Sequence, residues 1–194
     1  MYRFALLGLL TTLAMSAAKP TAGQNTGIDT RKSTITIHVG KSGLFSAAGH
    51  DHWVVAPIVS GEIGETGARS VHFSVDAHNL KVKPDAKVNP NDEAEIQETM
   101  QQKVLESEKY PVIQFRSSSV AQDARGSWIV TGELTLHGVS ESIVVTVKQA
   151  GEAYSGNARI KQTDFGIQPV RAAGGAVRVK NELDVQFQIY ALPK

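Results

Sequence analysis

The sequence predicts an all-β domain with one inserted α-helix, and two patterns indicate this. Most of the chain after residue 33 alternates apolar and polar residues with a period of two, which is typical of strands with one face in water. Residues 91–106 instead carry apolar residues four apart and contain no glycine or proline, as a helix does. Numerous strands joined by glycine-rich and polar turns usually close into a barrel or stack as a sandwich.

Each predicted strand follows from its own alternation. In residues 34–39 (TITIHV), Ile35, Ile37 and Val39 share one face. Within residues 128–136, Gly132 interrupts an apolar face, which predicts a bulge or a close approach of backbone. The same pattern of apolar residues on one face recurs in residues 69–78, 113–115, 128–136, 143–147, 158–160 and 183–189.

The helix is predicted over residues 91–106 (NDEAEIQETMQQKVLE). Its apolar residues Ile96, Met100 and Val104 form a single stripe. Either Asn91 or Asp92 is expected to cap its N-terminus, and the early acidic residues suit the positive end of the helix dipole. The domain is therefore expected to be one sheet with a helix inserted between its early and late strands.

The first 18 residues resemble a secretory signal peptide. Arg3 precedes an apolar run at residues 4–14, and small residues follow at 16–18. A helix of that run would rise about 16 Å, roughly half of a bilayer core, so a permanent membrane span is not expected, although an N-terminal anchor is the alternative. We expect cleavage before Ala17 or Lys19, a flexible lead at 19–32, a folded domain at 33–194, and a periplasmic or secreted protein.

Composition excludes several functions. The 194 residues suffice for one well-buried domain, and 20 basic against 19 acidic residues give no basic excess of the kind that nucleic-acid binding needs. The chain has no cysteine, which excludes disulfides, thiolate metal ligands and a cysteine nucleophile. No Gly-x-Ser-x-Gly turn accompanies the Asp76–His78 pair, so catalytic residues are not expected, and no dinucleotide or phosphate loop is present.

The segment Gly49-His50-Asp51-His52-Trp53 is the most unusual stretch of the sequence. In an extended chain, His50 and His52 point the same way about 7 Å apart. Two imidazoles so placed could ligate a metal, but the spacing fixes no third ligand. The histidines that could supply one are His38, His72, His78 and His137. The other interpretation is that both histidines hydrogen-bond to backbone or water.

The interior of the predicted barrel is the remaining candidate site. A barrel of about eight strands has room for one apolar ligand if its inward residues are not too bulky. Valine, isoleucine, leucine and alanine fill much of the predicted inner face. A lipid-holding cavity and a solid core both fit this pattern.

Four motifs occur in an order similar to that of the YceI-like family. They are residues 104–117 (VLESEKYPVIQFRS), 128–139 (WIVTGELTLHGV) followed by 143–147 (IVVTV), 163–167 (TDFGI) and 182–187 (ELDVQF). The resemblance runs from about Ser33 to the C-terminus. It implies an extended lipocalin-like, antiparallel eight-stranded barrel in the periplasm that holds a polyisoprenoid chain, with no catalysis and no cofactor.

One segment departs from the commoner members of that family. Where they carry a Gly-x-Phe-rich segment after the first strand, this chain has Gly43-Leu44-Phe45-Ser46 and then Gly-His-Asp-His at residues 49–52. At a barrel mouth, His50 and His52 could contact a phosphate or quinone oxygen of the ligand's head group.

The expected ligand is a long-chain isoprenoid or another apolar lipid. The residues expected to contact it are the large apolar ones on the predicted inner face or in the matched motifs, together with the two histidines: Phe45, His50, His52, Trp53, Phe73, Phe115, Trp128, Leu134, Leu136, Phe165 and Phe187. Two other functions stay open: a metal- or haem-linked redox accessory protein using His50 and His52, and a ligand-free structural module. The sequence also leaves open whether the barrel forms a homodimer.

Overall fold

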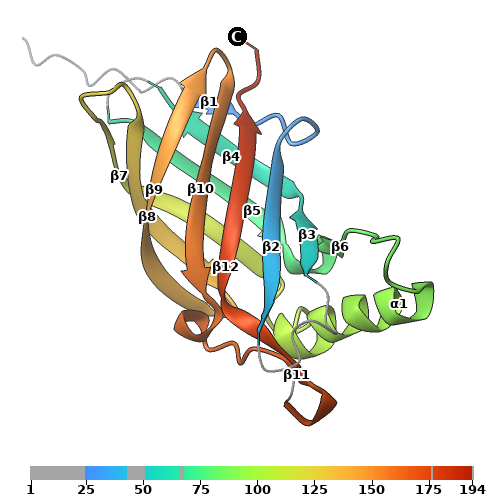
Figure 1. Ribbon diagram of the computed structural model, residues 1–194. Helices are drawn as coiled ribbons and strands as arrows, with labels where there is room; N and C mark the ends of the chain where they lie inside the picture. The colour runs from blue at the N-terminus through green and yellow to red at the C-terminus, as the bar shows by residue number, and fades with distance from the viewer. Residues whose placement is uncertain (1–24, 43–50, 66–67, 176, 194) are drawn as a thin grey trace, which may run out of the picture.

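A computed structural model describes residues 25–42, 51–65, 68–175 and 177–193 of the chain (Figure 1). Its strands form one antiparallel sheet in the order β1-β4-β5-β7-β8-β9-β10-β12-β2-β3-β6, with β11 added beside β12. The strands are β1 (Asn25–Gly27), β2 (Thr34–Ser42), β3 (His52–Ala56), β4 (Ile58–Gly64), β5 (Ser70–Asp76), β6 (Lys81–Val82), β7 (Val112–Gln122), β8 (Trp128–Leu136), β9 (Val139–Ala150), β10 (Ala153–Lys161), β11 (Arg171–Ala172) and β12 (Val177–Tyr190).

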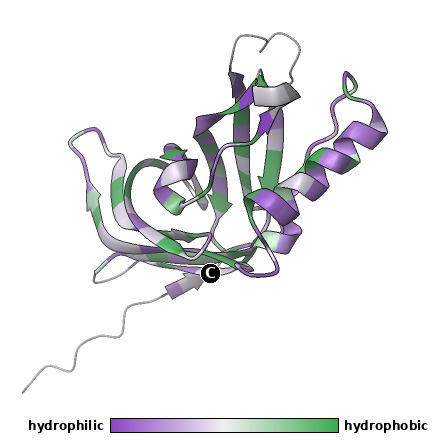
Figure 2. Cartoon of the chain, turned by 90° about the horizontal axis from the view of Figure 1, so that it is seen from below, coloured by the Kyte–Doolittle hydropathy of each residue, from purple (hydrophilic) through white to green (hydrophobic). Residues whose placement is uncertain are grey.

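The sheet curls around an interior, which confirms the lipocalin-like fold class (Figure 2). The structure has more strands than the eight expected, because four short ones, β1, β3, β6 and β11, extend the sheet beyond its eight long strands. In the described part of the chain the sheet order ends at β1 and β6, so the barrel is curled without a closed ladder. Pro57 separates β3 from β4 and sends the chain from one end of the sheet order to the other.

The N-terminal lead differs from its prediction over residues 25–32. β1 pairs with β4, and Ile28 is buried and bridges to Ala191. The backbone N–H of Asp29 donates to the carbonyl of Tyr190 at 2.8 Å, and its Oδ1 accepts the N–H of Arg31 at 3.1 Å. The burial of Ile28 and the hydrogen bonds of Asp29 hold this segment against the sheet. Neither residue produces an alternating pattern in the sequence. The predicted signal peptide and residues 19–24 lie outside the described residues.

The helix begins one residue earlier than predicted and changes its geometry part-way. Asn89 caps α1 (Pro90–Thr99) by accepting the N–H of Asp92 at 2.9 Å, so neither Asn91 nor Asp92 is the cap. Pro90 suits the first helical position because its missing N–H would have no partner there. A π-helical turn, Met100–Val104, continues α1. Among the described residues, no helix is long and apolar enough to cross a membrane.

Short 3-10 turns complete the fold at Ala77–Asn79, Gln162–Phe165 and Ala173–Gly175. The close backbone approach predicted at Gly132 is confirmed. A Cβ placed there would collide with the ring of Phe115 and, at 2.7 Å, with the carbonyl of Arg116. The β7–β8 register also shifts between Ser117 and Ser119, beside this glycine. The Phe115 ring therefore occupies the space that a side chain at position 132 would need.

Candidate functional site

The interior of the curled sheet holds a cavity of about 590 Å³. That volume is within the range of about 300–1,000 Å³ of small-molecule sites. Its wall is mostly aliphatic and aromatic, and every long strand contributes to it. The interior of the barrel is therefore not solidly packed, which favours the ligand-holding interpretation over a solid core.

The cavity is elongated along the strands. On β12 its lining runs from Val177 to Ile189. That stretch covers roughly 40 Å of strand, or about 30 Å along the barrel axis if the strands are tilted by about 40°. A sphere of the same 590 Å³ would be only about 10 Å across, so the space suits a long, narrow molecule.

The helical segment closes one side of the cavity. Its apolar stripe Ile96, Met100 and Val104, predicted from the sequence, lines the wall together with Leu105. No residue of α1 is fully buried, so this stripe packs only partly against the sheet. Figure 1 shows α1 at the end of the barrel opposite the β7–β8 hairpin. We call these two ends the helix end and the hairpin end.

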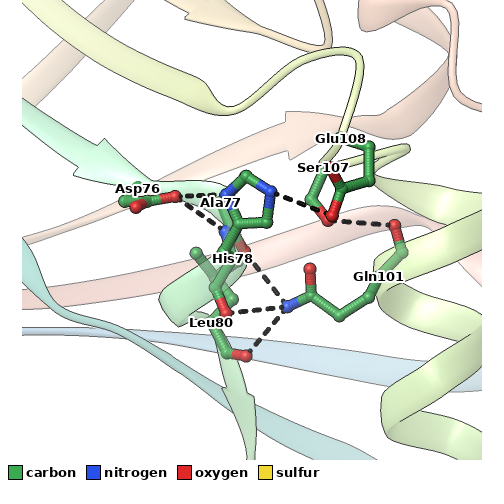
Figure 3. A network of polar contacts seen from close by, with 7 residues as sticks. All are labelled: Asp76, Ala77, His78, Leu80, Gln101, Ser107 and Glu108. Carbon is green, nitrogen blue, oxygen red and sulfur yellow. Dashed lines mark hydrogen bonds and ion pairs between the residues drawn. The ribbon is translucent and has the colours of Figure 1, made fainter.

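Two glutamines attach the helical segment to residues 77–82. Gln97 accepts the N–H of Val82 at 2.8 Å and donates to the carbonyl of Leu80 at 2.9 Å. The Gln101 amide nitrogen faces the carbonyls of Ala77, at 3.1 Å, and Leu80, at 3.1 Å (Figure 3). These bonds fix the stripe's position, and the sequence analysis missed them because glutamine carries no periodic signal.

The polar lining of the cavity differs between its ends. At the helix end it consists of Lys41, His52, Asp92, Glu95, Thr99, Gln162 and Arg178. At the hairpin end it consists of Arg69, Ser70, Tyr154 and the indole of Trp128. The two carboxylates of the described lining are thus both at the helix end.

The structure places seven of the eleven predicted contact residues in the cavity wall. These are His52, Phe73, Phe115, Trp128, Leu134, Leu136 and Phe187. Phe73 and Phe115 stack with ring centroids 5.6 Å apart, and Phe187 lies against Gly156 on the neighbouring strand. Phe45 and His50 lie outside the described residues.

Trp53 does not line the cavity. It is 38% exposed and packs against His38, with ring centroids 4.7 Å apart and the ring planes tilted by 38°. On β3 the inward positions are His52, Val54 and Ala56, so strand alternation turns Trp53 outward. The run His52-Trp53-Val54-Val55-Ala56 has no clear alternation of polarity, so the sequence does not show which of these residues face inward.

Phe165 also lies off the cavity wall, in the protein core, where it is 1% exposed. It ends the turn Gln162–Phe165, which Gly166 closes in the left-handed region with φ of 72°. The turn directs the ring into the core, and its own carbonyl accepts a hydrogen bond from the His137 ring at 3.3 Å. Phe165 therefore supports the barrel end and does not face the interior space.

Three of the five described histidines lie beside carboxylates. His38 Nε2 donates to Asp51 at 3.2 Å, His78 Nδ1 to Asp76 at 2.8 Å, and His137 Nε2 to Glu106 at 2.7 Å. In the residues that the structure describes, no three histidine or acidic side chains gather as a metal site. The His50–His52 pair stays a prediction, because its first member lies outside them.

Neighbouring donors and cations lower the pKa values of two carboxyl groups on the outer face, Asp51 and Asp184. Burial acts to raise the pKa of Asp51, but hydrogen bonds from the Lys41 N–H and from His38 outweigh it and lower that pKa. The Arg159 guanidinium, 2.7 Å from Asp184, lowers the pKa of that carboxyl. Both carboxylates therefore stay ionised near neutral pH.

Comparison with known proteins assigns the chain to a family. The model of the YceI-like domain matches residues 27–191, nearly the whole described chain. The chain belongs to the YceI-like family. The predicted family is thereby confirmed.

Curated relatives are similar over less than half of the chain. A UPF0312 protein of Vibrio cholerae is 30% identical over 42% of this chain and 47% of its own length. One of Pseudomonas savastanoi pv. phaseolicola is 31% identical over 43% of this chain and 47% of its own. The match thus spans about half the length of these relatives.

Two solved structures share the fold. BcnA of Burkholderia cenocepacia has a TM-score of 0.59 and 19% identity, covering 85% of this chain and 99% of its own. A polyisoprenoid binding domain from Saccharophagus degradans, implicated in plant cell wall breakdown, has a TM-score of 0.59 and 15% identity, covering 89% and 100%. At these identities the likeness establishes the fold alone.

Proposed function

We propose that this protein is a periplasmic or secreted binding protein that holds one long-chain isoprenoid or similar lipid in its cavity, for transport, storage or a stress response. The elongated apolar cavity of about 590 Å³ carries the proposal. The polyisoprenoid-binding name of the S. degradans neighbour supports the ligand class. No catalytic residue and no cofactor are part of this function.

Burial of the chain supplies the binding energy. Each 100 Å² of apolar ligand surface removed from water contributes about 2.5 kcal/mol, from which the cost of ordering the ligand is subtracted. The stacked Phe73–Phe115 pair and Leu134 supply wall on β5, β7 and β8, and Phe187 supplies it on β12. His52 contacts the ligand at the helix end in this proposal.

Native mass spectrometry of the mature protein, purified from its own source without added lipid, tests the proposal. A discrete mass excess is expected that organic solvent extracts and that is identified as a prenyl or other long-chain lipid. A bare polypeptide mass, still bare after incubation with polyprenyl lipids, would overturn it. N-terminal sequencing of the same sample is expected to begin at Ala17 or Lys19.

A pair of neighbouring residues on β9 tests whether the lipid binds inside the barrel. Ile143 lines the cavity, and Val144 is 64% exposed on the opposite face. Ile143→Trp is expected to fill the space and to lower lipid affinity at least tenfold, whereas Val144→Trp adds the same side chain outside and leaves it unchanged. Equal affinity in both folded variants, judged by circular dichroism, would show that the lipid binds elsewhere.

A further inference from the structure

A guanidinium lies at the hairpin end of the cavity. Arg69, just before β5, lines the wall, and its Cζ is 4.2 Å from the centroid of the Trp128 ring at the start of β8. Since β7 lies between β5 and β8 in the sheet, the side chain reaches across the inner face of β7. Val120 of β7 lines the cavity at this level.

The indole that carries this guanidinium is itself held in place. Trp128 Nε1 donates to Gln149 Oε1 at 3.1 Å, and Gln149 Nε2 donates to the hydroxyl of Tyr154 at 3.0 Å. The chain of bonds joins β8, β9 and β10 around the rim. A guanidinium over an aromatic ring keeps its N–H groups in its own plane, where they can still donate to a ligand.

No group of the described residues uses those donors. Within the described residues, Arg69 makes no hydrogen bond, and no carboxylate lies within 4.0 Å of it. At the helix end, by contrast, Arg178 Nε donates to the carbonyl of Gly175 at 3.0 Å. Arginine offers five N–H donors and matches phosphate or carboxylate oxygens in a bidentate way.

The charges of the lining also distinguish the two ends. Asp92 and Glu95 line the helix end together with Lys41, His52 and Arg178. An anion there would face two carboxylates, which offset the attraction of the cations. At the hairpin end the described lining contains one guanidinium and no carboxylate. The lining therefore favours an anion at the hairpin end.

We propose that Arg69 binds an anionic head group, a phosphate or a carboxylate, so that the ligand lies with its head at the hairpin end and its tail towards α1. This inference rests on the proposed lipid-binding function and adds the orientation and the charge of the ligand. Ser70 contributes a neutral hydroxyl at the same rim. Trp128 acts as a positioning residue for the guanidinium.

Two arginines at opposite ends of one cavity supply a matched test. The probes are a polyprenyl monophosphate, the polyprenol of the same chain length and a long-chain fatty acid. The wild-type protein is expected to bind the phosphate about 10- to 100-fold more tightly than the alcohol, as charge-assisted bonds allow. Arg69→Gln is expected to remove that preference and to change the alcohol's affinity less than about twofold. Arg178→Gln is expected to retain it.

Comparing the fatty acid with the polyprenyl phosphate shows whether the site prefers a carboxylate or a phosphate. Either preference supports the inference if Arg69→Gln abolishes it. Tryptophan fluorescence gives a second measurement. In a Trp53→Phe background only Trp128 remains as an indole, and its emission is expected to change more with the phosphate than with the alcohol.

The outcomes separate the two proposals. If the wild-type protein binds none of the probes, the lipid-binding function itself fails. If it binds the alcohol and the phosphate equally, or if Arg178→Gln and not Arg69→Gln removes the preference, the cavity function stands and the assignment of Arg69 is overturned.

Discussion

The cavity has two kinds of wall, one made of strands and one made of the helical segment. In the strand wall, long antiparallel ladders fix every position, and Phe115 and Phe187 lie over Gly132 and Gly156 on adjacent strands. The helical wall is attached through a few side-chain hydrogen bonds and a partly buried stripe. The strand wall therefore sets the cavity's shape, and the helical wall is the part that opens at lower free energy.

The junction between α1 and its π-helical turn is another weakly held part of the helical wall. The Leu105 N–H donates to the carbonyl of Met100 at 2.9 Å, one residue further back than in an α-helix. The Gln101 Oε1 is buried with no hydrogen-bond partner among the described residues. A buried oxygen without a partner costs about 1–3 kcal/mol. This cost falls on the helical wall and not on the strand wall.

The strand wall gives the largest expected effect. Gly132→Ala places a Cβ against the Phe115 ring and the Arg116 carbonyl, which cannot both move away. Overpacking of this kind lowers the free energy of unfolding by about 1–3 kcal/mol. Chemical denaturation measures it, with Ser142→Ala on the exposed side of β9 as a control expected to change stability by less than about 0.5 kcal/mol. A neutral Gly132→Ala would contradict the rigid-wall description.

The helical wall is broken most directly at Gln97. Gln97→Ala removes two hydrogen bonds and leaves the Val82 N–H and the Leu80 carbonyl with less support, costing about 1–2 kcal/mol. We expect faster hydrogen exchange in residues 90–105 and faster lipid dissociation, with little change on β8 and β9. Gln102→Ala is the matched control, because the Gln102 side chain donates to Glu98 on the exposed side and not to residues 77–82 in the described structure. Equal exchange in both variants would show that the glutamine contacts do not hold the helix.

The start of α1 tests the helical wall with a smaller change. Asn89→Ala removes the cap that accepts the Asp92 N–H, and such a loss costs about 1 kcal/mol. Helix fraying is expected in hydrogen exchange of the first turn. Asn91→Ala, at the position that the sequence favoured for the cap, is expected to have almost no effect. The reverse order of the two effects would restore the sequence-based assignment.

The sequence predicted what repeats and missed what occurs once. Alternation over seven of the eight long strands, the stripe Ile96, Met100 and Val104, and the interruption at Gly132 each use a periodic pattern, and the structure contains all of them. The eighth long strand, β4, was not predicted, and its register with β5 shifts between Ile58 and Ser60. Segment 25–32 and strands β3, β6 and β11 are too short for a period to register. Their positions depend on single contacts such as that of Ile28 with Ala191.

The candidate site divides in the same way. Aromatic and leucine residues at inward positions of clearly alternating strands, such as Phe73 and Leu134, line the cavity. Trp53 and Phe165 do not, since the first lies in a continuous apolar run and the second in a turn. Arg69 was overlooked because its role depends on Trp128, which is 59 positions away in the sequence and two strands away in the sheet. Only tertiary structure brings that pair together.

The smallest expected effect is a pH dependence of the free energy of unfolding. It arises at Asp76 and His78, at the start of the segment 77–82 to which the helical wall is attached. A hydrogen bond from the His78 side chain, and a second from its backbone N–H, lower the pKa of Asp76 below its ordinary 3.8. A carboxyl with a lowered folded-state pKa stabilises the fold above its unfolded-state pKa, and this stabilisation is lost as pH falls through the folded-state pKa.

His78→Ala removes the largest cause of that shift, so its free energy of unfolding is expected to fall less steeply than that of the wild type between about pH 5 and pH 2. The pair is exposed, and the difference will be smaller than the three above. Urea denaturation across that pH range measures it. Asp76→Asn is the control, because asparagine can still cap the turn. In that background, His78→Ala is expected to leave the pH dependence of the free energy of unfolding unchanged in the acid range. Parallel wild-type and His78→Ala curves would show that the bond to Asp76 contributes nothing to stability.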